Sequence, residues 1–236
     1  MKLDILAFGA HPDDVELSIG GLMIAEAKKG KSTGIIDLTY GELGTRGNPE
    51  LRQKEAAVAG SIMGLKTRMN LGLPDGMFDL SRENKLRVIE ILRKYKPDIV
   101  ITNAMNDRHP DHGRAAQLVL EACFLSGLHK IDDDKSESDA WRPRAVYHYM
   151  QFYHTQPDIV YDISDVIDEK IACIMAHKSQ MYDPESNEPE TLISSKHYFE
   201  NITGRASEYG LQAGFRYGEP LNSARIPGIK DLGVLW

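Results

Sequence analysis

Short apolar segments alternate with longer amphipathic segments along the first half of the chain, and this alternation limits the fold more than any other feature. Leu3 to Gly9 is the first apolar run, and Val15 to Lys29 follows it with apolar residues at helical spacing. Strands that alternate with helices of such lengths indicate βαβ units, so we expect an α/β fold with a mostly parallel sheet. Further strands are expected at Thr33–Thr39, Thr67–Leu71 and Asp98–Thr102, and further helices at Pro49–Met63, Ser81–Tyr95 and Gly113–Leu128.

The second half of the chain is less regular. Residues 132–139 are rich in charge, and we expect them to form a surface loop. Residues 183–236 are poor in periodicity and richer in Gly, Pro and Asn, which predicts an irregular C-terminal layer. Between these segments, strands are expected at Ala145–Tyr153 and Asp158–Ile163, and a helix at Val166–Lys178. We expect a single domain over residues 1–236, with a motif-bearing core at 1–130 and a C-terminal layer at 140–236.

Composition excludes several classes of protein. The 28 Lys and Arg residues against 35 Asp and Glu residues give a formal charge of −7, which disfavours a nucleic-acid binder. Cys123 and Cys173 both lie in apolar stretches, as buried thiols of a reducing compartment would. The first apolar run is too short for a signal peptide, and no run approaches the roughly 20 residues of a membrane span. We therefore expect a cytoplasmic protein that acts on a small molecule, without nucleic-acid or membrane partners.

Two polar clusters directly follow expected strands. The first is His11-Pro12-Asp13-Asp14, and the second runs from Asn106 to His112 after the strand at 98–102. Parallel strands end at the same edge of a sheet, where α/β proteins place their ligand sites. If the two strands are near neighbours, His11, Asp14 and His112 supply two imidazoles and one carboxylate. That set predicts a catalytic zinc site with open coordination positions, although Fe²⁺ or Co²⁺ would accept the same ligands.

Other residues of the two clusters suit acid–base chemistry. Asp13 would lie next to the metal without binding it, which suits a general base for a metal-activated water. His109 precedes His112 by three residues and could stabilise an oxyanion or protonate a leaving amine. We expect Asp111 to fix the tautomer of His109 and to favour its protonated form.

The first cluster also has a purely structural explanation, because Asp14 could cap the helix that begins near Val15. For His11 and Asp14 alone, the two explanations weigh about equally. The second cluster favours a site, because two His-Pro-Asp segments after buried strands are hard to explain by packing.

Two other classes of function remain open on the residues alone. A set of two histidines and a carboxylate is also the facial triad of non-haem Fe(II) oxygenases, which usually have an all-β fold. A non-catalytic sugar- or nucleotide-binding module is the third candidate, but no G-x-G-x-x-G motif follows the first expected strand.

Together the clusters resemble the LmbE-like, or PIG-L-type, zinc-dependent N-deacetylases. Ala10 to Asp14 and His109 to His112 match the first and last blocks of that family, and Thr39 to Gly47, with Arg52 and Glu55, matches the block between them. The resemblance implies a Rossmann-like three-layer fold and hydrolysis of the acetamide of an N-acetylglucosamine conjugate. His11, Asp14 and His112 would bind zinc, Asp13 would activate water, and His109 with Asp111 would assist.

The resemblance is greatest to the bacillithiol branch, whose substrate is N-acetylglucosaminyl malate, and it implies a hexamer. Chitobiose-type and inositol conjugates of N-acetylglucosamine are the alternative substrates. Within the resemblance, Arg52 would add positive charge near the substrate, Asp75 would contact a sugar hydroxyl, and Arg108 could reach an anionic group. Without it, Arg52 could pair with Glu55 on a helix surface and Asp75 could be an ordinary turn residue. Arg46, Arg52, Arg108 and His109 predict a locally positive mouth on an acidic protein.

Overall fold

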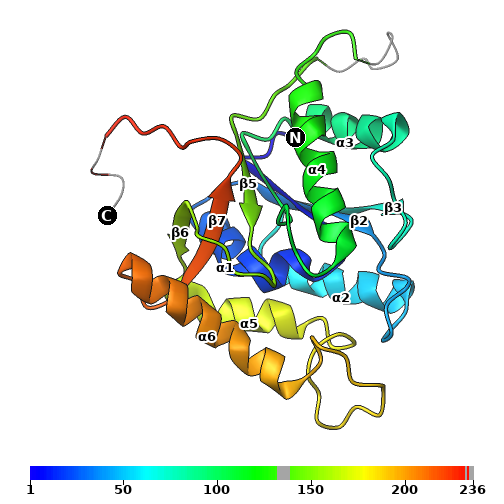
Figure 1. The fold of residues 1–236 in the computed structure, drawn as a ribbon, viewed down its shortest axis with the longest axis vertical. Coiled ribbons are helices and arrows are strands. Elements are labelled where there is room, and N and C mark those ends of the chain that lie inside the picture. Colours follow the sequence, from blue (N-terminus) through cyan, green and yellow to red (C-terminus); the bar gives the residue numbers. More distant parts are fainter. Residues whose placement is uncertain (132–138, 232, 234–236) are drawn as a thin grey trace.

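A seven-stranded sheet with the order β3-β2-β1-β4-β5-β7-β6 forms the centre of the molecule (Figure 1). The computed structural model describes residues 1–131, 139–231 and 233. Strands β1 to β5 pair in parallel, whereas β7 pairs antiparallel with both β5 and β6. The strands span Ile5–Gly9 (β1), Thr33–Thr39 (β2), Thr67–Leu73 (β3), Ile99–Thr102 (β4), Ala145–Tyr149 (β5), Ile159–Asp162 (β6) and Gly218–Ser223 (β7).

Helices cover both faces of this sheet. Helices α3 and α4 lie on one face, and α1, α2, α5 and α6 lie on the other (Figure 1). They span Asp14–Lys28 (α1), Pro49–Ile62 (α2), Arg82–Tyr95 (α3), Pro110–Leu125 (α4), Ile167–Met175 (α5) and Lys196–Ala213 (α6), and a short 3₁₀ helix covers Ser164–Val166. The expected three-layer α/β fold with a mostly parallel sheet is confirmed.

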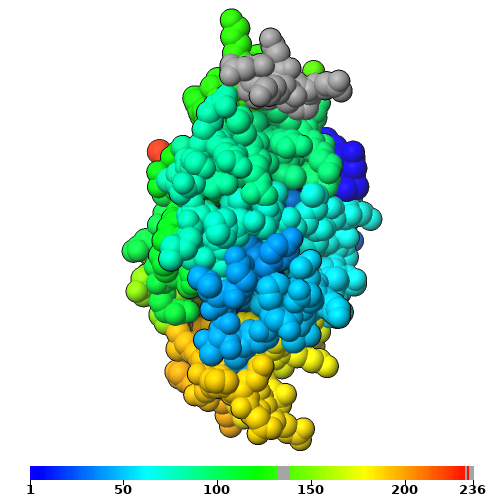
Figure 2. Space-filling model, turned by 90° about the vertical axis from the view of Figure 1, so that its right-hand side faces the viewer, coloured from blue at the N-terminus to red at the C-terminus, as the bar shows by residue number. Residues whose placement is uncertain are grey.

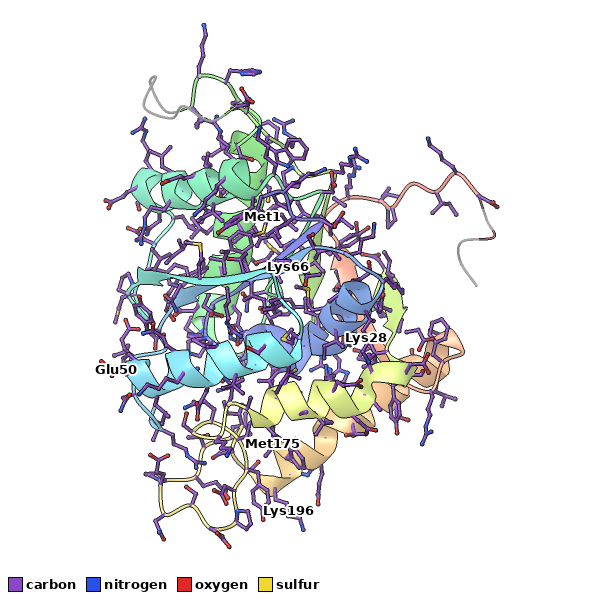
Figure 3. All side chains as sticks on the ribbon, turned by 180° about the vertical axis from the view of Figure 1, so that it is seen from behind. Met1, Lys28, Glu50, Lys66, Met175 and Lys196 are labelled. Atoms are coloured by element: carbon purple, nitrogen blue, oxygen red, sulfur yellow. The ribbon has the colours of Figure 1, made fainter. Side chains whose placement is uncertain are left out.

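Two apolar cores separate the layers. Phe8 and Leu38 of the sheet pack with Leu92 and Val119 toward α3 and α4. On the opposite face, strand residues pack with α1 and α5, and Figure 3 shows α5, which ends at Met175, running beside α2. The strands of such a sheet are buried on both faces, which is why they appear in the sequence as nearly continuous apolar runs.

The order of the strands explains where the polar clusters meet. β1 has β2 on one side and β4 on the other, so the chain reverses its direction of winding at β1. The crevice at such a reversal, outside the carboxyl ends of the strands, is the usual ligand site of α/β sheets. The clusters that follow β1 and β4 therefore leave the sheet from adjacent strands.

The C-terminal part is more regular than the sequence suggested. Residues 183–236 contain the 18-residue helix α6 and the strand β7, which inserts between β5 and β6. Helix α6 has clear end signals, because Ser195 accepts a hydrogen bond from the Tyr198 N–H and Gly214 ends the helix with a φ of 82°. Pro220 concealed β7, since proline is uncommon in an inner strand.

Two further differences concern boundaries. Helix α4 begins at Pro110 and not at Gly113, so Asp111 and His112 belong to its first turn rather than to a loop. The expected surface loop at 132–139 lies outside the described residues except for Asp139. Among the described residues, no helix is long and apolar enough to cross a membrane.

Candidate metal and active site

The start of α1 carries two buried carboxylates that do not cap the helix. Asp13 occupies the N-cap position, but its side chain makes no capping hydrogen bond, and its φ of 130° is unusual for a residue with a side chain. Asp14 is the first helical residue. The capping explanation of this cluster is therefore wrong. Backbone strain of this kind concentrates at functional sites, where the surrounding structure holds it in place.

Asp14 lies between the two predicted metal-binding histidines. Its Oδ2 is 3.6 Å from Nδ1 of His11, and its Oδ1 is 3.3 Å from Nε2 of His112. Asn103 and Gln151 donate side-chain hydrogen bonds to the same carboxylate, at 3.0 and 2.5 Å. The structure thus brings His112 to His11 and Asp14, from which it is separated by about a hundred residues of sequence.

His109 joins this group. His11, His109 and His112 each offer a ligand atom, and these atoms lie within 4.8 Å of one another. The ring centroids of His11 and His109 are 4.6 Å apart. The Nδ1 atom of His109 accepts a hydrogen bond from the backbone N–H of Asp111, so the proton of the neutral imidazole is on Nε2.

Carboxylates surround His11 on its other side. Its Nε2 is 3.0 Å from Oδ1 of Asp75 and 3.4 Å from Oδ2 of Asp111. Burial lowers the pKa of His11, but hydrogen bonds with Asp111, Asp14 and Asp75 raise it well above the usual value. The surplus of carboxylates around these imidazoles suits a cation, and the nitrogen and oxygen donors are those that zinc accepts. The donor set therefore fits the divalent metal that the sequence predicted.

Asp75 and Asp111 both contact His11. Asp75 is buried, accepts a hydrogen bond from the Leu43 N–H and contacts His11 directly, so it is more than an ordinary turn residue. The Asp111 carboxylate contacts Arg114 and the Gly76 N–H, and it touches His11 rather than the ring of His109. The backbone N–H of Asp111 does fix the tautomer of His109, and the Asp111 charge raises its pKa. Burial and the neighbouring His11 and His112 outweigh that effect and lower the pKa of His109, so the net balance does not favour the expected protonated form.

Asp107, which the sequence reasoning did not single out, orients His112. Its Oδ2 lies 2.8 Å from His112 Nδ1, while its Oδ1 accepts the N–H groups of Arg108 and Tyr153. Burial lowers the pKa of His112, but Asp14 and Asp107 raise it to about 9. A carboxylate behind the distal nitrogen of a ligating histidine is common at metal sites, because it fixes the ring orientation.

Arg52 holds Asp13 from behind. The Arg52 side chain is buried and donates to the backbone oxygens of Pro12 and Gly41, at 2.9 and 3.1 Å, and to Asp13 Oδ2 at 3.3 Å. A Cβ at Gly41 would meet this guanidinium at 1.8 Å, so glycine is required there. Burial raises the pKa of Asp13 and Arg52 lowers it, and the balance is about 6. The surface pairing of Arg52 with Glu55 is wrong, since Glu55 instead binds Ser179.

A second buried charge network links α1 to the C-terminal layer. Glu16 contacts Arg68 and accepts a hydrogen bond of 2.9 Å from His177. The His177 side chain is fully buried. Arg68 also makes a double contact with Asp37 of β2. These contacts fix the first turns of α1, and with them the position of the two aspartates.

The site opens into a hollow of about 190 Å³, which we call the catalytic hollow. Arg108 is an exposed residue of its wall, whereas Arg46 is not in the wall and pairs with Glu188 and Ser186. Figure 2 shows the segment after β2 lying directly against the segment between α5 and α6 that carries Glu188. The predicted positive mouth is thus reduced to Arg108 and Arg52, beside the carboxylates of Asp13 and Asp14.

Comparison with known proteins connects this geometry to a family. A family model described as PIG-L, GlcNAc-PI de-N-acetylase, matches residues 6–123, which hold both polar clusters. The chain belongs to the PIG-L family. The resemblance predicted from the two clusters is thereby confirmed, and with it the deacetylase class of the chain.

Individual relatives agree with this membership. Diacetylchitobiose deacetylase of Thermococcus kodakarensis is 29% identical over 95% of this chain and 84% of its own length. A probable N-acetyl-alpha-D-glucosaminyl L-malate deacetylase 2 of Bacillus subtilis is 27% identical over 76% of this chain and 84% of its own. The crystal structure of a conserved Thermus thermophilus protein, 34% identical, superimposes with a TM-score of 0.87 over 98% of both chains.

Proposed function

We propose that this PIG-L protein hydrolyses the acetamide of an N-acetylglucosamine conjugate and releases the free amine and acetate. The observation that carries the proposal is the arrangement of Asp13 and Asp14. Both carboxylates are buried beyond the carboxyl ends of the strands, and neither caps the helix. Asp14 contacts His11 and His112, and Asp13 belongs to the wall of the same hollow.

Asp13 is the proposed general base. A base works best when its pKa lies near the working pH, and the pKa of Asp13 is raised to about 6 by burial, against the lowering effect of Arg52. The carboxylate would take a proton from the attacking water as oxygen adds to the amide carbon. The same proton can then pass to the nitrogen as the carbon–nitrogen bond breaks, so the base is regenerated.

His109 is the proposed donor toward the developing negative charge on the amide oxygen. Its Nδ1 is occupied by the Asp111 N–H, which leaves the Nε2–H for the catalytic hollow. A neutral imidazole is sufficient as a hydrogen-bond donor, so this role does not require the raised pKa that the sequence predicted. Arg52 acts here as a positioning residue for Asp13, because its donors are engaged by the backbone and by that carboxylate.

A divalent metal, which we propose to be Zn²⁺, would be held by His11, Asp14 and His112. When bound, it would polarise the amide carbonyl and lower the pKa of a water molecule to about 7. Asn103 and Gln151 hold the Asp14 carboxylate, and Asp107 holds the His112 ring, so this chain orients each proposed ligand through another side chain.

There are two candidates for the group that is linked to N-acetylglucosamine in the substrate. N-acetylglucosaminyl malate is the candidate favoured by the motifs, and the exposed Arg108 at the catalytic hollow supports an anionic group. A second sugar is favoured by the relative that covers 95% of this chain, a diacetylchitobiose deacetylase. We further propose that the protein acts in the cytoplasm as a homo-oligomer, a hexamer, whose mass light scattering would measure.

The deciding experiment is an amine-release assay with added Zn²⁺ on N-acetylglucosamine and its malate, inositol and second-sugar conjugates. We expect release of amine and acetate in equal amounts, and loss of release after chelation with return on addition of metal. Activity that is absent on every conjugate, in protein shown to bind one equivalent of metal, would refute the proposal.

A further inference from the structure

A second hollow lies beside the catalytic hollow. It has a volume of about 250 Å³, and Leu17 and Gln151 belong to the walls of both. Arg108 belongs to the wall of the catalytic hollow, and its guanidinium carbon lies 5.4 Å from the ring centroid of Phe152, which belongs to the wall of the second hollow. We call this second space the side hollow. Its remaining wall comes from the segment after β5 and from α1, α5, α6 and β7, so it belongs to the junction of the core with the C-terminal layer.

A kink in α1 shapes the floor of the side hollow. Ile19 has non-helical backbone angles, and the backbone groups released there are bound by a buried ion pair between Lys170 and Glu219. Lys170 donates to the oxygen of Leu17, and Glu219 accepts the N–H groups of Gly21 and Leu22. Every charge of this floor is thus compensated, and the ion pair has no surplus for a charged ligand.

Three buried polar atoms of wall residues lack a hydrogen-bond partner within the described part of the chain. They are Oγ of Ser18, Oε1 of Gln151 and Nη2 of Arg205. The Ser18 side chain is itself buried, with 6% of the residue exposed. Leaving such atoms unpaired is costly, so groups of this kind ordinarily have a partner from a ligand or water.

The types of these atoms indicate the chemistry of the partner. Arg205 can only donate, Gln151 Oε1 can only accept, and Ser18 can do both. A polyol satisfies all three, because each hydroxyl donates and accepts. A dicarboxylate would satisfy Arg205 but would face the acceptor oxygen of Gln151, whose amide Nε2 already donates to Asp14. Phe152 and Tyr198 add apolar ring surface to the wall, which suits the carbon–hydrogen face of a sugar.

We propose that the side hollow is a second sugar subsite, which binds a neutral pyranose ring linked to the N-acetylglucosamine unit in the catalytic hollow. This inference rests on the proposed deacetylase function and names the class of its substrate. The two hollows together reach the size of ordinary small-molecule sites, about 300–1,000 Å³, which the catalytic hollow alone does not.

The test compares kcat/KM on N,N′-diacetylchitobiose with kcat/KM on N-acetylglucosamine for the zinc-supplied protein. We expect the ratio to be at least about tenfold in favour of the disaccharide, as two or more additional hydrogen bonds would give. Ser18→Ala should lower the ratio by about 3- to 10-fold, the loss of one hydrogen bond. Asn201→Trp, at an exposed wall residue of α6, should remove the preference by filling the entrance.

Matched controls come from the same helix. Ser207→Ala and Gln212→Trp change exposed residues of α6 outside the wall, and both should keep the wild-type ratio. Binding gives a second readout: calorimetry with the Asp13→Asn protein should show tighter binding of the disaccharide than of the monosaccharide, and Ser18→Ala in that background should weaken only the disaccharide.

The outcomes separate the subsite from the proposed function. Deacetylation of N-acetylglucosamine with a ratio near one, or with a ratio that neither wall variant changes, would overturn the subsite and leave the deacetylase intact. A preference for the malate conjugate that Ser18→Ala and Asn201→Trp reduce would overturn the neutral ring in favour of an anion. Failure to deacetylate any conjugate would overturn both proposals.

Discussion

Replacing Arg52 by methionine tests whether its guanidinium holds Asp13, as the structure indicates, or adds only a surface charge. An exposed pair with Glu55 would contribute about 0.2–0.5 kcal/mol. Arg52 is instead buried and donates to Asp13 and two backbone oxygens, and removing one partner of a buried pair costs about 3–5 kcal/mol. We expect the free energy of unfolding of the chelator-treated variant to fall by that larger amount at pH 8, measured by urea unfolding.

The loss should also depend on pH. Burial raises the pKa of Asp13 above its ordinary 3.8 to about 6, although Arg52 lowers it. A carboxyl whose pKa is raised by folding binds its proton more tightly in the folded state, so stability falls as pH rises through that window. Without Arg52 the pKa should rise by a further 1–3 units or so, each worth about 1.4 kcal/mol. The destabilisation at pH 9 should therefore exceed that at pH 5 by about 1.4–4 kcal/mol.

Asp13→Asn provides the control for the pH dependence, because it removes the carboxyl that Arg52 contacts. In the Asp13→Asn protein, the further change Arg52→Met should destabilise by a similar amount at pH 5 and pH 9. The reasoning fails if Arg52→Met alone costs less than about 1 kcal/mol, or if its cost is as independent of pH as it is in the Asp13→Asn protein.

Three further predictions concern the site and its support. Asp13→Asn should keep one equivalent of bound metal but lose about 10²–10⁴-fold in kcat in the amine-release assay, and full activity with bound metal would exclude it as the base. Asp107→Asn should weaken zinc binding about 10- to 100-fold in a chelator competition, because His112 loses its orienting carboxylate; unchanged affinity would argue that His112 is no ligand. Burial lowers the pKa of His177, but Glu16 raises it above 6.5, so its stabilising contribution is complete below that pH and is lost as pH rises through the folded value. His177→Gln should accordingly destabilise the protein more at pH 6 than at pH 9 in urea unfolding, and equal losses at both would contradict this.

The alternation of apolar runs was sufficient to predict β1 to β4 and the helices between them, because a parallel sheet buried on both faces leaves little ambiguity in the pattern. It was not sufficient for β7, whose Pro220 hides the strand. Helix α6 could have been found from Ser195, Gly214 and the apolar spacing of Phe199, Ile202, Ala206 and Tyr209, but its internal glycines weaken the pattern.

For the site, sequence position was enough to bring His11, Asp14 and His112 together, since all three follow adjacent strands. It could not indicate their supporting partners. Gln151 and His177 lie far along the chain and reach Asp14 and Glu16 only through tertiary packing, and Asp107 is one polar residue among several in its segment. The direction of the His109 pKa also required the structure, because the positions of His11 and His112 around it set the field that it experiences.

The kinked α1 limits how freely this architecture can be recombined. The helix that presents Asp14 at one end is completed further along by Lys170 and Glu219, which come from two different elements of the C-terminal layer. A chimera that imports a foreign C-terminal half to change the substrate would leave backbone groups of α1 without partners unless it carries both charges with it. A change of specificity in this chain can therefore alter the walls around the ion pair, but it has to keep both charges together with the helix that presents Asp14.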